Sequence, residues 1–227
     1  MNLTILAASG RTGLALTRKA VQRGHIVTAI ARDPGRIAVP GAQLVAGDVE
    51  DAASLAAVIG PDSVVLSALG TDRAGVLTAG AKAVVAAGPR RIIWLGAFGT
   101  GPSASPGSEV LAKVLGDRLA DKVEADGTIL AAGGTVFHAG MLDDGPESAS
   151  RRTVGLDAAP PFDLTATISR ETVAAAMLDE AETPRFTGAV AVPLPRWWGG
   201  GCWGCVGATK KHPPPPAGGR GGGGRAG

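Results

Sequence analysis

Short apolar segments alternate along this chain with longer segments whose apolar positions recur at helical spacing. Each short segment ends at a small or turn-forming residue, a pattern typical of the buried strands of a parallel sheet. The strands predicted in this way comprise residues 4–8, 26–31, 43–46, 64–68, 92–96, 135–138 and 189–194.

The segments between these strands have the periodicity and the terminal signals of α-helices. Ser169 and Glu171 are one such signal, because a serine caps a helix N-terminus and an acid in the first turn suits the helix dipole. We expect irregular structure between residue 139 and Leu164. The predicted helices comprise residues 12–23, 52–59, 76–87, 109–132 and 170 to about 181.

Strands and helices that alternate in this order predict an α/β fold. We expect a single Rossmann-like domain, residues 1–195, built on a doubly wound parallel sheet. Ligands of such sheets bind at the carboxyl ends of the strands, so we expect the functional site there.

The first strand leads through a small, glycine-rich turn, AASGRTG, directly into a helix. Glycines in such a turn let backbone N–H groups approach a pyrophosphate, and the helix N-terminus favours its negative charge. Ala7, Gly10 and Gly13 occupy the three positions of a G-x-x-G-x-x-G spacing. Alanine adopts a positive φ only at a cost, so we predict ordinary backbone angles at Ala7. The strand–turn–helix context favours dinucleotide binding over a purely structural turn.

Arg32 ends the second predicted strand, about twenty residues after the turn. A binder of NAD usually has an acid at this point for the ribose hydroxyls, whereas a guanidinium suits a 2′-phosphate. The sequence therefore favours NADP(H) over NAD(H). Asp33 leaves an alternative open, because its carboxylate either accepts from a ribose hydroxyl or begins a turn with Pro34.

The composition of the chain changes after Pro195. Residues 196–227 hold both cysteines, three of the four tryptophans, five of the 22 basic residues and none of the 20 acidic ones. Their Gly- and Pro-rich composition predicts a disordered extension. Cys202 and Cys205 have the spacing of a redox or metal pair. However, zinc needs four ligands and a redox pair needs a helix that opens at the second cysteine, so we expect no metal here.

The remaining domain, residues 1–195, is slightly acidic, which predicts no nucleic-acid surface. The chain has no run of 18 apolar residues, and no basic region precedes the first strand. These features predict neither a membrane span nor a secretory signal, and we expect a cytoplasmic protein.

Several motifs occur in the order typical of one known family. Residues 1–195 resemble the NmrA-like, atypical branch of the short-chain dehydrogenase/reductase superfamily, and within it NAD(P)H-binding proteins of the flavin-reductase and biliverdin-reductase type. The motifs that carry the resemblance are AASGRTG (7–13), ARDP (31–34), GDVED (47–51), VVLSALG (64–70), GMLDDGP (140–146) and ISRETVAAAMLDE (168–180).

The resemblance implies a set of residues along a bound cofactor. Arg32, with Arg11 as a second candidate, would hold the 2′-phosphate. Asp48 would flank the adenine together with Val49, although a turn or cap before the next helix explains Asp48 equally well. The other cofactor-binding residues implied are Ala8, Ser9, Gly10, Thr12 and Gly13 near the pyrophosphate, Ser67, Ala68 and Leu69 near the ribose, and Gly140 and Met141 near the nicotinamide.

The sequence lacks the acid–base residues typical of the superfamily. It contains no tyrosine, which rules out a Tyr-x-x-x-Lys pair, and Gly96 and Ala97 stand where a serine is expected. Direct hydride transfer from NADPH to an acceptor that needs little proton help, such as a flavin or a quinone, remains possible. The alternative is a non-catalytic, NADP-sensing regulatory protein whose affinity for a protein partner changes with the state of the cofactor.

Two side chains remain as candidate acids. His138 has an unperturbed pKa near 6.5, which would allow proton donation at neutral pH. The alternative for His138 is a strand-end histidine bonded to the backbone. Lys122 aligns with a helix lysine that reaches a ribose in the family, and the alternative is an exposed lysine paired with Glu124 or Asp126.

Overall fold

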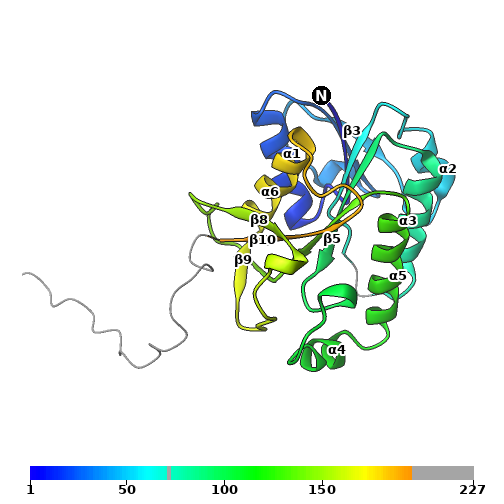
Figure 1. Cartoon of the computed structure of the whole chain (residues 1–227). Coiled ribbons are helices and arrows are strands. Elements are labelled where there is room, and N and C mark those ends of the chain that lie inside the picture. Colours follow the sequence, from blue (N-terminus) through cyan, green and yellow to red (C-terminus); the bar gives the residue numbers. More distant parts are fainter. Residues whose placement is uncertain (71–72, 196–227) are drawn as a thin grey trace, which may run out of the picture.

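The structure, a computed structural model, describes residues 1–70 and 73–195. Its centre is an eight-stranded sheet in the order β3-β2-β1-β4-β5-β6-β10-β8 (Figure 1). All pairs of neighbouring strands are parallel except β10 and β8. The strands are β1 (Asn2–Leu6), β2 (Ile26–Ala31), β3 (Gln43–Ala46), β4 (Val64–Ser67), β5 (Arg91–Ala97), β6 (Thr135–Ala139), β8 (Arg152–Gly155) and β10 (Val190–Leu194).

The predicted Rossmann-like, doubly wound sheet is confirmed, and each predicted strand is present with ends shifted by at most two residues. From β1 the chain winds outward through β2 to β3, then returns to place β4 on the other side of β1. The strand order therefore reverses between β1 and β4. A crevice forms at the carboxyl ends of the strands at such a point, and it is the usual ligand site of this architecture.

Helices cover both faces of the sheet (Figure 1). Successive residues of a strand point to opposite faces, so each central strand contributes to two cores. Ile93 of β5 packs on one side, and its neighbour Trp94 packs on the other. One face carries α1 (Arg11–Gln22) and α6 (Arg170–Glu182), and the other carries α2 (Ala52–Ala56), α3 (Val76–Ala87) and α5 (Arg118–Ala131).

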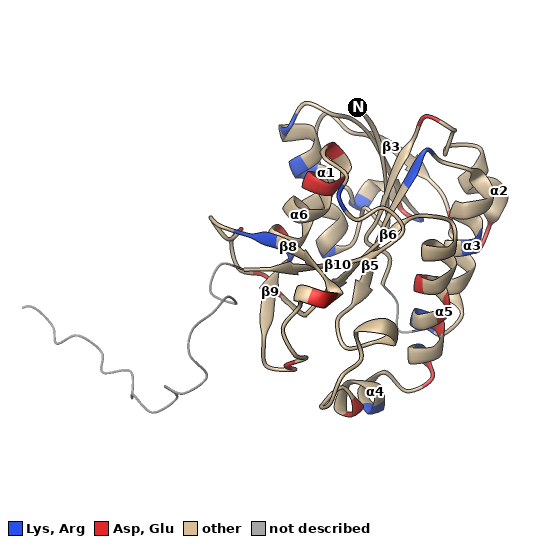
Figure 2. Ribbon diagram, in the orientation of Figure 1, with Lys and Arg blue, Asp and Glu red and all other residues tan. Residues whose placement is uncertain are grey.

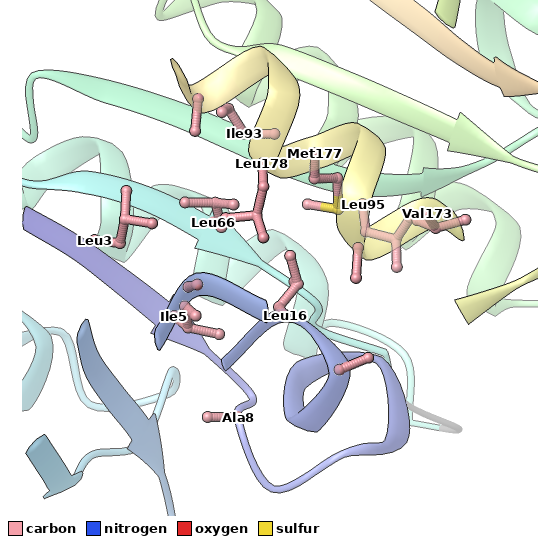
Figure 3. Packing of buried hydrophobic residues seen from close by; sticks show 14 of the residues in the cluster. Leu3, Ile5, Ala8, Leu16, Leu66, Ile93, Leu95, Val173, Met177 and Leu178 are labelled. Atoms are coloured by element: carbon pink, nitrogen blue, oxygen red, sulfur yellow. The ribbon is translucent and has the colours of Figure 1, made fainter. Parts of the chain in front are cut away.

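The core beneath α1 and α6 is formed by branched aliphatic side chains. Figure 3 shows Leu16 of α1 and Leu178 of α6 directed toward Ile5 and Leu66 of the sheet. The two helices are also joined by ion pairs, because basic residues of α1 and its C-cap residue Arg23 face acidic residues of α6 (Figure 2). Lys19, for example, lies 2.8 Å from Glu171.

The single helix predicted over residues 109–132 is wrong. The structure has two helices, α4 (Glu109–Leu115) and α5, separated by Gly116 at φ 53°. This backbone conformation favours glycine and ends α4. Arg118 then donates hydrogen bonds to the carbonyl oxygens of Val114 and Leu115, the last two residues of α4, at 3.0 and 3.2 Å.

The expectation of irregular structure between residues 139 and 164 is also wrong. Two strands lie in this range. β7 (Met141–Asp143) forms a small parallel sheet with the later strand β9 (Thr167–Ser169), and β8 adds an antiparallel edge to the main sheet. The predicted helix cap is confirmed, since Ser169 Oγ accepts a hydrogen bond from Thr172 N at 3.1 Å. No helix in the described residues is long and apolar enough to cross a membrane.

Candidate functional site

The turn between β1 and α1 is shaped by a strained alanine. Ala7 has φ 56°, so the prediction of ordinary backbone angles at this position is wrong. Two backbone hydrogen bonds of 3.0 Å fix the conformation, one from Gly10 N to Ala7 O and one from Ala8 N to Ile30 O. The bond to Ile30 O therefore holds the turn against the end of β2. The sequence of the turn alone does not predict this bond, because its acceptor lies on another strand.

Gly13 lets the first turn of α1 lie directly on this loop. A Cβ atom at residue 13 would stand 2.2 Å from Ala7 O and 2.7 Å from Ala8 Cα. Gly10 occupies the N-cap position without a side-chain hydrogen bond to the helix. The N–H groups of the first turn of α1 therefore have no side-chain cap, and this end of a helix attracts anions.

A pocket of about 290 Å³ lies next to this turn, at the carboxyl ends of β1, β2, β3 and β4. It brings together six of the residues predicted to bind a cofactor: Ser9, Gly10, Arg32, Asp48, Val49 and Leu69. Sequence reasoning missed the other residues of its wall, which are Leu6, Ala7, Ile30, Ala31, Arg36, Gly47, Glu50, Gly70, Arg73 and Val76.

Three arginines and two acidic residues, Asp48 and Glu50, line this pocket. Arg73 forms an ion pair with Glu50, another pocket residue. Within residues 1–70 and 73–195, the guanidinium groups of Arg32 and Arg36 make neither a hydrogen bond nor an ion pair. Asp33 lies outside the pocket wall, and its Oδ1 accepts a hydrogen bond of 3.1 Å from Gly35 N. Of the two alternatives for Asp33, the structure shows the one in which this residue begins a turn with Pro34.

Two further predicted residues also hold the local backbone. Asp48 lines the pocket, and its Oδ1 also accepts a turn hydrogen bond from Glu50 N at 3.0 Å. A contact between Asp48 and the adenine stays a prediction. The cap of α2 is instead Asp51, which accepts from Ala53 N and Ser54 N. Ser67 is fully buried, and its hydroxyl accepts a hydrogen bond of 3.3 Å from Leu69 N.

The other predicted cofactor residues lie outside this pocket. Arg11 is exposed and forms an ion pair of 2.8 Å with Asp144, which also binds Arg170 at 2.6 Å. Gly140 and Met141 lie at the junction of β6 and β7, where Met141 is 47% exposed. Four more are absent from the pocket wall and are buried or partly buried: Ala8, Thr12, Gly13 and Ala68.

His138 is completely buried and bonds to side chains, so the alternative of a backbone bond is wrong. Its Nδ1 lies 2.6 Å from Ser103 Oγ and its Nε2 lies 3.1 Å from Asp126 Oδ2. Gly96 makes room for this pair, because a Cβ there would stand 2.8 Å from His138 Cδ2 and 2.9 Å from Asp126 Oδ2. Without access to solvent, His138 is poorly placed to protonate a substrate directly.

Lys122 is partly buried, which corrects the alternative of an exposed lysine. Burial has the largest effect on this group and lowers the pKa of the ammonium below its usual 10.5, although Asp126 and Asp121 act in the opposite direction. Glu124, one of the two partners considered for Lys122, forms an ion pair of 2.8 Å with Lys82. In the part of the chain that the structure describes, the Lys122 ammonium makes no hydrogen bond.

The strand order, the glycine turn and the pocket at the switch point define a dinucleotide-binding protein. A family model described as NAD(P)H-binding matches residues 7–184, and the chain belongs to this family. This membership confirms the predicted resemblance to NAD(P)H-binding proteins. No cluster of three or more potential metal ligands occurs in the described residues.

Solved structures share this architecture over nearly their whole length. A protein of Burkholderia pseudomallei is 28% identical, with a TM-score of 0.70 over 85% of this chain and 98% of that one. ChuY, an anaerobilin reductase of Escherichia coli, is 21% identical, with a TM-score of 0.74 over 86% and 98%. A short-chain dehydrogenase/reductase of Veillonella parvula in complex with NADP is 18% identical, with a TM-score of 0.69 over 87% and 95%.

Proposed function

We propose that the protein is an NADPH-dependent oxidoreductase that passes a hydride directly to a flavin- or quinone-like acceptor. Bound NADPH would supply the hydride. The chain would supply the binding groups: the α1 N-terminus for the pyrophosphate, Val49 and Leu69 around the adenosine, and Gly140 with Met141 beside the nicotinamide.

The observation that carries the choice of NADPH is the pair Arg32 and Arg36. Both guanidinium groups face the pocket without a partner among the described residues, whereas the Asp33 carboxylate is engaged with Gly35 N. A 2′-phosphate is a dianion that two arginines bind through charge-assisted hydrogen bonds. An NAD-specific site would instead present a free acid to the ribose hydroxyls.

The choice of acceptor rests on the groups that the chain lacks. It contains no tyrosine, and Gly96 and Ala97 offer no hydroxyl at the end of β5. A carbonyl that needs a strong acid is therefore a poor substrate, whereas an oxidised flavin or quinone accepts a hydride without the usual relay. The similarity in fold to an anaerobilin reductase supports a reductase chemistry.

The test is the oxidation of NADPH by the purified protein with FMN, FAD and simple quinones. We expect turnover with at least one of these acceptors and a lower KM for NADPH than for NADH. Binding of NADPH without turnover on any acceptor would contradict the enzymatic proposal.

A second proposal is a cofactor-sensing regulatory protein without catalysis. The burial of His138 in bonds to Ser103 and Asp126 favours it, because that candidate acid has no access to solvent. A pull-down from cells with and without added NADP tests it. A partner that binds only in one cofactor state, together with no turnover, would support this proposal over the first.

A further inference from the structure

The Asp144 carboxylate, in the segment between β7 and β8, is held by two arginines that begin two different helices. Its Oδ2 lies 2.8 Å from Arg11 Nη1, and its Oδ1 lies 2.6 Å from Arg170 Nη1. Arg11 is the first residue of α1, and Arg170 is the first residue of α6. Each carboxylate oxygen therefore binds a different guanidinium group, from a residue at the positive end of a helix dipole.

Arg11 is adjacent in the chain to the groups expected to bind the cofactor's pyrophosphate. It directly follows Gly10, which lines the pocket and is the N-cap residue of α1 without a side-chain hydrogen bond. The N–H groups of such a turn bind phosphate, and a guanidinium binds phosphate through charge-assisted hydrogen bonds. The partner of Arg11 in the structure is nevertheless a carboxylate of the chain itself, that of Asp144.

The two ion pairs of Asp144 differ in exposure. The side chain of Arg11 is 70% exposed, whereas that of Arg170 is 14% exposed. An exposed ion pair is weak, because water and salt screen it and both side chains lose freedom, so Arg11 can exchange its partner at low cost. The bond to Arg170 remains after this exchange, and the carboxylate is not left unpaired.

The segment that carries Asp144 is fixed to α1 and α6 by other bonds as well. Glu147 forms an ion pair of 2.7 Å with Lys19 in α1. The hydroxyl of Ser169, the N-cap residue of α6, donates a hydrogen bond of 2.8 Å to Pro146 O. These bonds do not involve Arg11, so the Asp144 carboxylate stays beside the N-terminus of α1 when its own bond to α1 breaks.

We propose that Asp144 competes with a phosphate group of the dinucleotide for Arg11 and thereby lowers the affinity of the protein for its cofactor. This proposal rests on the part of the proposed function that places the pyrophosphate at the N-terminus of α1. Binding exchanges one ion pair for another, because the bond between Arg11 and Asp144 breaks, a bond between Arg11 and phosphate forms, and Asp144 keeps Arg170. Such an internal competitor favours exchange of the oxidised for the reduced dinucleotide.

The test is a double-mutant cycle on the Kd for NADPH, measured by titration of cofactor fluorescence at one fixed ionic strength. Asp144→Ala leaves Arg11 to the phosphate, so we expect it to tighten NADPH binding about two- to fivefold, the range of an exposed ion pair. Arg11→Gln should weaken binding. In the Arg11→Gln background, Asp144→Ala should have no effect, because the residue through which Asp144 acts is gone.

Glu147→Gln is the matched control. It removes an acidic group from the same segment, but the partners of Glu147 are Lys19 and Arg151, so the Kd for NADPH should stay unchanged. Tighter binding in this variant would overturn the proposal, because a general loss of negative charge would then explain the effect. Tighter binding on adding Asp144→Ala to Arg11→Gln would overturn it for the same reason.

The remaining outcomes separate this proposal from the proposed function. If the unaltered protein binds neither NADPH nor NADH, both are overturned. If it binds NADPH and Asp144→Ala leaves the Kd unchanged, only the role of Asp144 is overturned, since the reduction of an acceptor is measured independently. An unchanged Kd in Arg11→Gln would also overturn it, because Arg11 would then bind no phosphate.

Discussion

The Asp121 carboxylate on α5 caps the N-terminus of α3 by accepting a hydrogen bond of 2.9 Å from Thr78 N. A second bond of 3.1 Å comes from Leu77 N. The N-cap residue of α3 itself is Gly75, which has φ 87° and no side chain to offer. The cap therefore comes from another helix, 43 residues further along the chain. It joins α5 to α3, whose first residue Val76 lines the pocket.

The cap predicts a pH-dependent contribution to stability. Burial alone would raise the pKa of the Asp121 carboxyl, but hydrogen bonds from Thr78, Leu77 and Gly75 outweigh it and hold the pKa below 3.8. A group with a lowered pKa in the folded state stabilises the fold above its unfolded pKa, and this stabilisation is lost as the pH falls through the folded pKa. Asp121→Ala should lower the free energy of unfolding by about 1–3 kcal/mol at pH 7.

Urea unfolding at several pH values checks this prediction, and the difference from the unaltered protein should shrink below about pH 4. Asp117→Ala is the matched control, because Asp117 makes no side-chain cap hydrogen bond to α5. An equal loss of stability for both variants, or a loss that does not depend on pH, would contradict the cap as its cause.

Arg32→Ala is expected to weaken NADPH binding by about 1.5–3 kcal/mol, the range for a hydrogen bond to a charged group, and to change NADH binding little. Titration of cofactor fluorescence measures both constants. Asp33→Asn is the companion variant. It keeps an acceptor for Gly35 N and should leave both cofactors unaffected, whereas a selective loss of NADH binding would assign the ribose to Asp33.

Ala7→Gly should stabilise the protein. A left-handed conformation costs alanine about 1–2 kcal/mol, and the greater freedom of glycine in the unfolded chain returns about 0.4–1 kcal/mol of this. We expect a net gain of up to about 1.5 kcal/mol in the free energy of unfolding. Ala8→Gly, next to it at a negative φ, should instead be destabilising. A loss of stability in Ala7→Gly would show that the alanine is not strained.

Gly13→Ala should be strongly destabilising, because its Cβ would stand 2.2 Å from Ala7 O and backbone atoms cannot yield cheaply. We expect a loss of about 3 kcal/mol or more, at the upper end of overpacking, together with weaker NADPH binding. Gly127→Ala is the control in α5. No atom lies within 4 Å of its added Cβ, so this substitution should gain about 0.5–1 kcal/mol. Thermal unfolding and NADPH titration of both variants measure these effects.

The sequence pattern was sufficient for the main sheet because its strands are apolar and separated by helices. It was insufficient for β7 and β9, since strands of three residues carry no periodic signal. The end of α4 at Gly116 was missed because an isolated glycine does not always end a helix.

The residues of the candidate site likewise differ in whether the sequence predicts them. The glycine turn and Arg32 are contiguous with a strand, so a local pattern predicts them. Arg73 reaches the pocket only through the packing of distant segments. The partners of His138 are likewise set by tertiary packing, because Ser103 lies 35 residues before it. The predictions for residues 196–227, including those for Cys202 and Cys205, concern residues outside the part of the chain that the structure describes.

Gly96 has a consequence for how this sequence can evolve. Any side chain there meets both His138 and Asp126, so a serine at residue 96 requires a prior change in one of these two residues. Ala97, the next residue, is only partly buried and is the other place where a strand-end hydroxyl would arise. The order of substitutions therefore matters. While the His138–Asp126 pair is present, a serine does not fit at residue 96, and residue 97 is the position left for one.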